Sequence, residues 1–516
     1  MTSTSSSPSE QASPCSSNSM PITSDPKGRR RALIIGGSVT GMSVARVLRE
    51  HYDEVVIIER DDLSSELRPR RGVPQSAQPH GLQMRGRAEL DELFPGYVET
   101  VKQGGGNEVD LGSEMARYTP WGWAPTHPVQ VKGLLASRPL METTIRDLLL
   151  RDCPEIRWLK GVRVSGLRFE HVQGIPRVYG VETDSKDESL RYIDAELVVD
   201  ASGRGSKALR WFKEMGLPRP EEWRADSHSN YATRHYRRPD AASKWWWKAM
   251  MVDAVTPDIP SACSIFSVED DTWIVTAMGM DGQYVPTNEK EWLQHIANLR
   301  SPAVSEVIAL AEPKTDVIQS RSTHNIWRQM HRWKGEVDGL LLAGDAIGAF
   351  NPLYGQGITS AVVGAALLRD LLDAQKRKTG QVHVDHRFAR RFYKKHGPIL
   401  ALGWSYSTTF DYRWRSTTGK RPLLVDLQNW MGAQLSEVAM HDAKLFCALA
   451  PLLDFGAKPL SVITPAFVGR VWMGFAKRLL TGRPQPLGPG ALPLMQEQVP
   501  PHHGSRLVQP PAKLTP

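Results

Sequence analysis

The 516-residue sequence has few cysteines, and none stand in a metal-binding or disulfide-rich spacing. The four are Cys15, Cys153, Cys263 and Cys447, and no CxxC pair occurs. Zinc sites and small disulfide scaffolds need closely spaced cysteines, so neither is expected and a reducing compartment fits best. The chain also lacks any run of about eighteen apolar residues, the length that spans a bilayer. We therefore expect a cytoplasmic protein without a transmembrane segment, for which contact with a membrane surface stays open.

Other missing patterns narrow the class of function. There is no internal repeat, no Ser-His-Asp spacing and no metal-ligand cluster, and His383 and His386 lie in a charged stretch typical of a solvated helix face. The net charge of +8 arises from 64 basic and 56 acidic residues spread along the chain, so a nucleic-acid partner is not expected. The 41% hydrophobic content is enough to bury a large core.

Composition and hydrophobic periodicity divide the chain into segments. Residues 1–28, rich in serine and proline, are predicted to be a disordered tail, and residues 481–516 a proline-rich tail. Between them the pattern predicts an α/β fold with an inserted, mainly β substrate domain and a helical C-terminal region. The predicted segments are 29–100, 135–206 and 326–400 for a discontinuous nucleotide-binding domain, 101–134 and 207–325 for the substrate domain, and 401–480 for the helical region.

The clearest local signal is a glycine turn between an apolar strand at residues 32–35 and a helix at 40–50. It reads Gly36-Gly37-Ser38-Val39-Thr40-Gly41, and a second strand ends on Glu59. Gly36 permits a tight turn, Gly41 permits close contact of helix and strand, and the start of the helix favours a pyrophosphate. Glu59 is placed to accept hydrogen bonds from ribose hydroxyls. Ser38 replaces the usual middle glycine and is small enough to be tolerated, but this turn alone does not separate NAD from FAD.

Two later turns complete a longer pattern. One is Ser202-Gly203-Arg204-Gly205-Ser206 with Arg210, and the other is Gly344-Asp345, followed by Asn351-Pro352 and Gly355-Gln356-Gly357. In this order, over roughly residues 30–380, the three turns resemble those of FAD-dependent monooxygenases of the para-hydroxybenzoate hydroxylase type. Residues 71–82, RGVPQSAQPHGL, are similar to a segment of epoxidases and hydroxylases of polyketide and terpenoid pathways. The resemblance implies a Rossmann-like FAD-binding domain of the glutathione-reductase type.

The resemblance also implies which residues hold the cofactor. Asp345, a short carboxylate at a strand end, would accept from a ribityl hydroxyl, and residues 355–357 would turn helix N–H groups toward the flavin N1/C2=O edge. Arg138 takes the place of an arginine near the flavin and pyrophosphate, with a helix-capping surface arginine as the alternative. Val164 matches a backbone contact to adenine. The full predicted set is Gly36, Gly37, Ser38, Gly41, Glu59, Arg60, Arg138, Val164, Gly203, Asp345, Gly355, Gln356 and Gly357, with no metal.

The implied reaction inserts one oxygen atom from O2, through a C4a-hydroperoxyflavin, into a bulky hydrophobic small molecule of secondary metabolism. NADPH or NADH would be a transient reductant, because no second dinucleotide fingerprint occurs. No catalytic acid or base is identifiable, so epoxidation and hydroxylation both stay open. Phe350, Asn351 and Pro352 are the residues predicted to face the substrate. The alternatives are a flavin-dependent halogenase, whose Trp-x-Trp-x-Ile-Pro motif is only partly matched at residues 121–125, and a non-catalytic flavin-binding protein.

Overall fold

The structure is a computed structural model that describes residues 28–63, 67–70, 72–129, 131–320, 323–453 and 464–482. The two predicted tails lie almost wholly outside the described residues. The division of the chain into domains at the boundaries given above stays a prediction.

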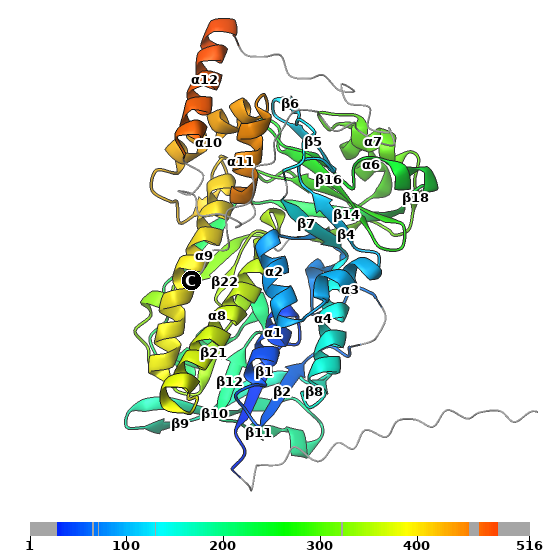
Figure 1. The fold of residues 1–516 in the computed structure, drawn as a ribbon. Helices are drawn as coiled ribbons and strands as arrows, with labels where there is room; N and C mark the ends of the chain where they lie inside the picture. Colours follow the sequence, from blue (N-terminus) through cyan, green and yellow to red (C-terminus); the bar gives the residue numbers. More distant parts are fainter. Residues whose placement is uncertain are drawn as a thin grey trace, which may run out of the picture.

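A five-stranded parallel sheet forms the centre of the larger part of the molecule (Figure 1). Its order is β21-β12-β1-β2-β8, and every neighbouring pair is parallel. The strands are β1 (Arg31–Ile35), β2 (Glu54–Glu59), β8 (Arg157–Lys160), β12 (Leu197–Asp200) and β21 (Leu340–Leu342). The register pairs Ile35 with Asp200 and Asp200 with Leu342. Three strand ends therefore meet at one edge, where open α/β sheets bind ligands.

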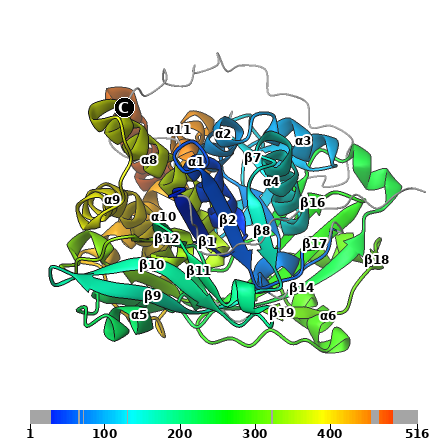
Figure 2. The same ribbon diagram turned by 90° about the horizontal axis from the view of Figure 1, so that it is seen from below.

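Helices cover one face of this sheet and a small antiparallel sheet covers the other (Figure 2). The helices are α1 (Val39–Leu48), α2 (Met84–Leu93), α4 (Arg138–Asp152) and α8 (Gln356–Thr379). The antiparallel strands are β9 (Val164–Val172), β10 (Ile175–Thr183) and β11 (Tyr192–Asp194). With both faces covered, β1 is buried along its whole length and its side chains are almost all apolar. The predicted α/β class is confirmed.

An eight-stranded, mostly antiparallel sheet forms the second core. Its strands are β5 (Met115–Thr119), β6 (Gly122–Trp123), β14 (Asn230–Arg237), β15 (Ala249–Val252), β16 (Ser261–Val268), β17 (Thr272–Gly279), β18 (Glu312–Pro313) and β19 (Ile318–Ser320). Two helices, α6 (Glu289–Ala297) and α7 (Ala303–Ile308), belong to the same hydrophobic core. That core contains Trp245, Trp247, Trp273 and Trp292, each at most 8% exposed. These tryptophans are packing residues of the β core.

Smaller elements connect the two cores. One sheet contains β3 (His80–Leu82), β7 (Lys132–Ala136) and β4 (Asn107–Asp110), near α3 (Tyr97–Gln103). Another contains β22 (Gly348–Ala349), β20 (Asn325–Arg328), β13 (Glu222–Asp226) and β23 (Thr418–Gly419). A short helix, α5 (Ala208–Glu214), follows the second glycine turn. The C-terminal helices are α9 (His386–Asp411), α10 (Val425–Ala439), α11 (Ala443–Leu453) and α12 (Pro465–Thr481).

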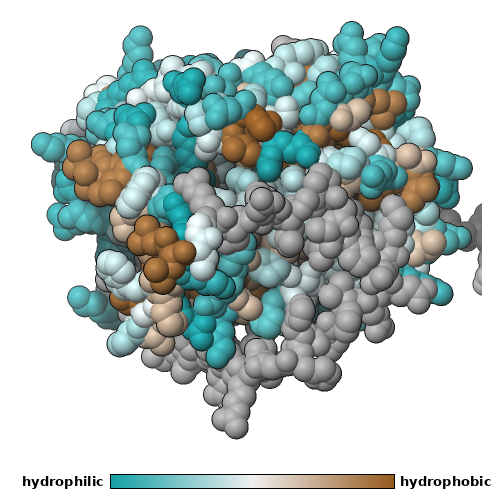
Figure 3. Space-filling model, turned by 90° about the horizontal axis from the view of Figure 1, so that it is seen from above, coloured by the Kyte–Doolittle hydropathy of each residue, from teal (hydrophilic) through white to brown (hydrophobic). Residues whose placement is uncertain are grey.

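Helices α10 and α12 lie at one end of the molecule and carry exposed apolar side chains, among them Trp430, Met431, Trp472 and Met473. Seen from that end, hydrophobic patches interrupt a mainly hydrophilic surface (Figure 3). Within the described ranges, every helix falls short of the combined length and hydropathy that crossing a lipid bilayer would require.

Candidate functional site

The first glycine turn has the geometry that its sequence predicts. Gly36 has φ of +103°, and a Cβ there would lie 2.7 Å from the carbonyl oxygen of Ala201, at the end of the neighbouring strand. A Cβ at Gly41 would overlap the carbonyl oxygen of Gly36. Only glycine fits either position, because α1 packs directly on the turn. The start of α1 thus lies at the strand ends, where its free N–H groups face outward.

Ser38 belongs to a charged cluster at the start of α1. Its backbone is extended and its hydroxyl does not cap the helix. Instead the hydroxyl donates to Glu142 and accepts from Arg138 Nη2 at 2.9 Å. Arg138 is 6% exposed and its guanidinium is 2.8 Å from Glu142, so it is a buried ion-pair residue at the start of α4 and not a surface cap. Serine at position 38 thereby connects the turn to α4.

Glu59 lies at the end of β2, 4% exposed, and accepts from the backbone N–H of Gly37 at 2.7 Å. Arg70, which is not in the predicted cofactor-binding set, has its guanidinium 3.4 Å from Glu59 and 3.1 Å from Glu142. Arg60, by contrast, is exposed and donates to a loop carbonyl. The first turn therefore lies among three carboxylates, including Asp61 at 2.9 Å from Arg70, and two arginines, the buried Arg138 and the half-buried Arg70.

The charge balance of this cluster lowers the pKa of Glu142. Burial alone would raise that pKa, but the attraction of Arg138 and Arg70 and the hydrogen bond from Ser38 outweigh it. A carboxylate with a lowered pKa stabilises the folded state above its ordinary pKa, and that contribution disappears as the pH falls through the folded value.

Glu142→Gln is expected to lower the free energy of unfolding of the flavin-free protein by about 3 kcal/mol at pH 7, because it removes the carboxylate that pairs with the buried Arg138. The difference from wild type should narrow as the pH falls below about 4.5. Urea denaturation at pH 7 and pH 4 measures both values. The control is Glu50→Gln, whose side chain is 51% exposed and whose loss should cost less than about 1 kcal/mol. An equal difference at both pH values would contradict the assignment.

Val164 lies close to the adenosine end of the predicted site. The backbone N–H of Val162 donates to the carbonyl of Glu59 at 3.1 Å, and Val164 begins β9 two residues later. The Val164 side chain is 6% exposed and its carbonyl accepts from Lys207 at 3.3 Å. The segment is thus held at the end of β2, beside the carboxylate predicted to bind the ribose.

The second turn is fixed by Asp200 at the end of β12. This fully buried carboxylate accepts from the N–H of Ser202 at 3.0 Å, from its hydroxyl at 2.5 Å and from Ser206 at 2.6 Å. Gly203 follows with φ of +75°. Because every acceptor contact of Asp200 is local, its role is to shape the turn. This turn places Gly203 beside Asp345, because a Cβ built at Gly203 would lie 4.0 Å from the Cβ of Asp345.

Asp345 is the unusual residue of the third turn. Among the described residues its carboxylate has no hydrogen-bond donor, and burial raises its pKa against the attraction of Arg204 and Arg138. A Cβ at Gly357 would lie 3.9 Å from the nearest protein atom, which is Oδ1 of Asp345. The carboxylate therefore borders open space between the second turn and the start of α8.

The start of α8 completes the edge of that space. Gly355 precedes the helix with φ of +65°. The Gln356 side chain is buried and donates to the Tyr354 carbonyl at 2.8 Å, while its Oε1 and the Thr359 hydroxyl have no partner among the described residues. The backbone N–H groups in the first helical turn of α8 have no partners within the helix, and they form the positive end of the helix dipole.

The residues predicted to face the substrate do not share one environment. Phe350 is 3% exposed, and its ring packs against Gly403 of α9. Asn351 is fully buried and its side chain is engaged in hydrogen bonds. Pro352 is exposed. Arg204, another residue that the sequence analysis did not assign, donates to the carbonyls of Phe350 and His324 and so connects the second and third turns.

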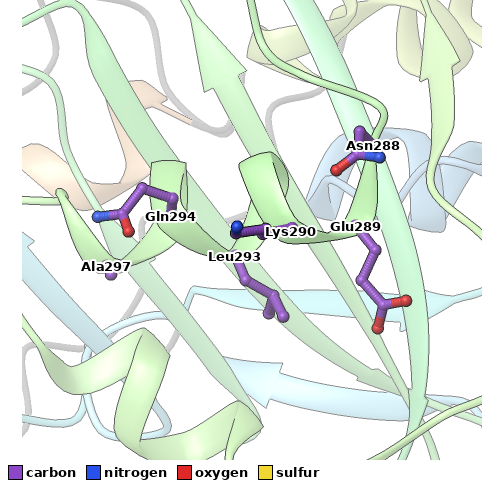
Figure 4. A pocket seen from close by; sticks show the side chains of 6 residues that line it. All are labelled: Asn288, Glu289, Lys290, Leu293, Gln294 and Ala297. Carbon is purple, nitrogen blue, oxygen red and sulfur yellow. The ribbon is translucent and has the colours of Figure 1, made fainter.

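A separate hollow runs along α6 (Figure 4). Its six lining residues, Asn288, Glu289, Lys290, Leu293, Gln294 and Ala297, come from this helix and its N-cap. None of them belongs to a glycine turn, and no buried charge is among them. The candidate site therefore lies at the glycine turns.

Comparison with known proteins places the chain in a family. No protein-family model matches the sequence. Protein Rv3254 of Mycobacterium tuberculosis is 31% identical over 357 residues, which cover 67% of this chain and 73% of that protein. The chain belongs to the Rv3254 family.

Solved structures share the fold of this Rv3254-family chain. A flavoprotein/dehydrogenase from Cytophaga hutchinsonii has a TM-score of 0.60 at 17% identity and covers 86% of this chain and 99% of its own. The flavin-dependent brominase Bmp2 has a TM-score of 0.58 at 13% identity, and the match covers 87% of this chain and 99% of the brominase. PqsL, a probable FAD-dependent monooxygenase from Pseudomonas aeruginosa, has a TM-score of 0.52 at 14% identity, and the match covers 78% of this chain and 98% of PqsL. The predicted resemblance to FAD-dependent monooxygenases is confirmed at the level of the fold.

The residues of the Rv3254-family chain fit FAD. Three features suit a polyhydroxylated chain joined to an electron-accepting ring: the Asp345 carboxylate, which has no donor among the described residues, the open space beside Gly357, and the N–H groups at the start of α8 that have no partner within the helix. At the other end, the turn at Gly36, the half-buried Arg70 and the buried Arg138 suit a pyrophosphate. Arg138 acts electrostatically on both ends, since it pairs with Glu142 and attracts Asp345.

Proposed function

We propose that this protein binds FAD at the three glycine turns and is a monooxygenase of a bulky hydrophobic small molecule. The observation that carries the proposal is Asp345, a half-buried carboxylate that has no donor among the described residues and borders the open space before α8. Bound FAD would supply the activation of O2. One oxygen atom enters the substrate and the other leaves as water, with a hydride from NADPH or NADH and one proton from solvent completing the balance.

The chain's own residues supply binding and orientation. Glu59 would accept from the ribose, Arg70 and Arg138 would neutralise the pyrophosphate, and Asp345 would accept from the ribityl chain. The N–H groups at the start of α8 would favour negative charge on the adjoining ring edge. The eight-stranded sheet next to the turns, with Met278 and Met280 near Tyr231, supports an apolar substrate region.

The alternative of halogenation is not favoured by the contacts of the described residues. Trp123, in the partial Trp-x-Trp match, is 2% exposed and packs edge-on against Tyr118 in the β core, 5.1 Å between ring centroids. It contacts none of the glycine turns by any interaction described above.

Anaerobic mixing of the FAD-loaded protein with NADPH or NADH, in the presence of candidate polyenes and phenols, tests the proposal. We expect one of these substrates to accelerate flavin reduction and, after addition of ¹⁸O-labelled O2, to yield a product carrying one labelled oxygen atom. A halogenated product formed with chloride or bromide and a separate flavin reductase would overturn monooxygenation. Bound FAD without oxidation of either nicotinamide would favour the non-catalytic alternative.

A further inference from the structure

A buried carboxylate at the end of α9 lies against the loop that leads into α8. Asp411 is 1% exposed. Its Oδ1 accepts from Ser227 at 3.0 Å, from Asn351 at 3.1 Å and from the hydroxyl of Tyr354 at 2.9 Å, and its Oδ2 accepts from Asn325 at 2.5 Å. Four donors from three other parts of the fold therefore converge on one carboxylate.

The network continues through Asn351, which precedes the flavin-facing turn. Its Oδ1 accepts from the Tyr231 hydroxyl at 2.5 Å and from the N–H of Leu353 at 3.2 Å, and its own N–H donates to Asn325 at 2.8 Å. The side chain of Asn351 is thus fully used by protein partners. Asn351 therefore connects Asp411 with the loop at residues 351–354 through hydrogen bonds.

This loop sets the direction of α8. Tyr354 immediately precedes Gly355, whose φ of +65° begins the helix. The Tyr354 ring stacks on Phe410, with centroids 5.5 Å apart, while its hydroxyl is bound to Asp411. Movement of Asp411 would therefore move the residue that leads into Gly355, Gln356 and the N–H groups behind them.

The ionised form of the Asp411 carboxylate lowers the stability of the folded protein. Burial raises the pKa of Asp411 to about 6, although hydrogen bonds from Tyr354, Ser227, Asn325 and Asn351 oppose the rise. At neutral pH the ionised form is present and the folded state is less stable than with a neutral group there. Costly buried carboxylates of this kind concentrate at functional sites.

We propose that Asp411 is a positioning residue that, through Asn351 and Tyr354, fixes the turn before Gly355 so that the start of α8 is aimed at the flavin. The inference rests on the FAD site of the proposed function. The hydrogen bonds of the Asp411 carboxylate reach this loop at Asn351 and Tyr354, and no sequence pattern connects position 411 with positions 351–357.

Replacement by asparagine tests the proposal. Asp411→Asn should weaken FAD binding about tenfold, measured by fluorescence titration of the flavin-free protein, because charged hydrogen bonds to the turn are lost. The melting temperature of the flavin-free variant at pH 7.5 should stay at or above the wild-type value, because an ionised buried group is removed. Asp385→Asn, at the opposite end of α9 where Asp385 caps the helix, is the matched control and should bind FAD like wild type.

The pH profile separates positioning from a merely structural role. In wild type the FAD affinity should rise with pH through about 6 and then level off, since four donors need the ionised carboxylate. The other groups facing Asp411 are Tyr354 and Tyr412, with Tyr231 and Arg204 beyond Asn351. The pKa of each of the three tyrosines is raised, so they stay neutral in this range, and Arg204 stays charged. The step near pH 6 should be absent from Asp411→Asn.

Tyr354→Phe keeps the ring stack and removes one donor, so it should weaken FAD binding by a smaller factor and provides the test if Asp411→Asn does not fold. Wild-type FAD affinity in both variants would overturn the positioning role. The positioning role would also be overturned if Asp411→Asn lost FAD affinity together with a lower melting temperature and Asp385→Asn lost the same amount of affinity. If wild type itself does not bind FAD, the proposed function fails, which is a different result from equal binding by wild type and variants.

Discussion

Asp345→Ala is expected to purify as a folded protein that has lost most of its flavin. The wild-type carboxylate has no protein donor among the described residues, so the substitution removes no protein contact that holds the third turn. It does remove the acceptor for the ribityl chain, and a hydrogen bond to a charged group contributes about 1.5–3 kcal/mol. The dissociation constant for FAD should therefore rise by about tenfold to a hundredfold.

The stability of the flavin-free protein should change in the opposite direction. Burial raises the pKa of Asp345, so its ionised form destabilises the folded state at neutral pH, and this cost disappears as the pH falls below the unfolded value near 4. Asp345→Ala should therefore unfold at a higher urea concentration than wild type at pH 8 and at about the same concentration near pH 4.

The matched control is Asp370→Ala, which removes a 65% exposed carboxylate from α8. It should retain its flavin and its stability, because exposed ion pairs contribute little. A fully yellow Asp345→Ala protein with wild-type affinity would show that Asp345 is not a ribityl ligand. A variant that is colourless and unfolded would show that the carboxylate supports the third turn.

Local pattern was sufficient for the first turn and for the elements around it. The apolar run at residues 32–35, the helix periodicity after Thr40 and the acid at Glu59 lie within thirty residues, and the structure places β1, α1 and β2 there. The helix whose N–H groups residues 355–357 were expected to present is α8, which begins at Gln356. Each of these signals depends on neighbours in sequence, which is what hydrophobic periodicity reports.

Residues whose role depends on distant partners escaped that reasoning. Arg70 meets Glu142 across 72 positions, and Arg204 meets Phe350 across 146. Asp411 lies in a helix that reads as amphipathic, and its partners are 57 to 184 positions away. Asn351, which is predicted to face the substrate, has a side chain that hydrogen-bonds to Tyr231 and Asp411 inside the protein. Side-chain direction in a loop is set by tertiary contacts, which spacing does not contain.

Gly357→Val is expected to fold normally and to exclude FAD. A Cβ at this position has no protein atom closer than 3.9 Å, so the fold has room for a larger side chain. Gly357 is also the second residue of α8, where valine costs the helix less than glycine does. The valine methyl groups would instead enter the space beside Asp345 that the ribityl chain and the ring edge require.

A contrasting glycine in the same helix separates the effect on FAD from the effect on folding. A Cβ at Gly364 would lie 2.9 Å from His396 Nε2 of α9, so Gly364→Val should lower the melting temperature of the flavin-free protein through overpacking of about 1–3 kcal/mol. Gly357→Val should leave that melting temperature unchanged and should raise the FAD dissociation constant about a hundredfold. The dissociation constant of Gly357→Ala should lie between those of wild type and Gly357→Val. Calorimetric titration with FAD measures the dissociation constant of each variant, and a thermal scan of the flavin-free protein measures its melting temperature. Wild-type affinity in Gly357→Val would place the cofactor elsewhere than at the start of α8, because a site occupied at that helix end has no room for the added methyl groups.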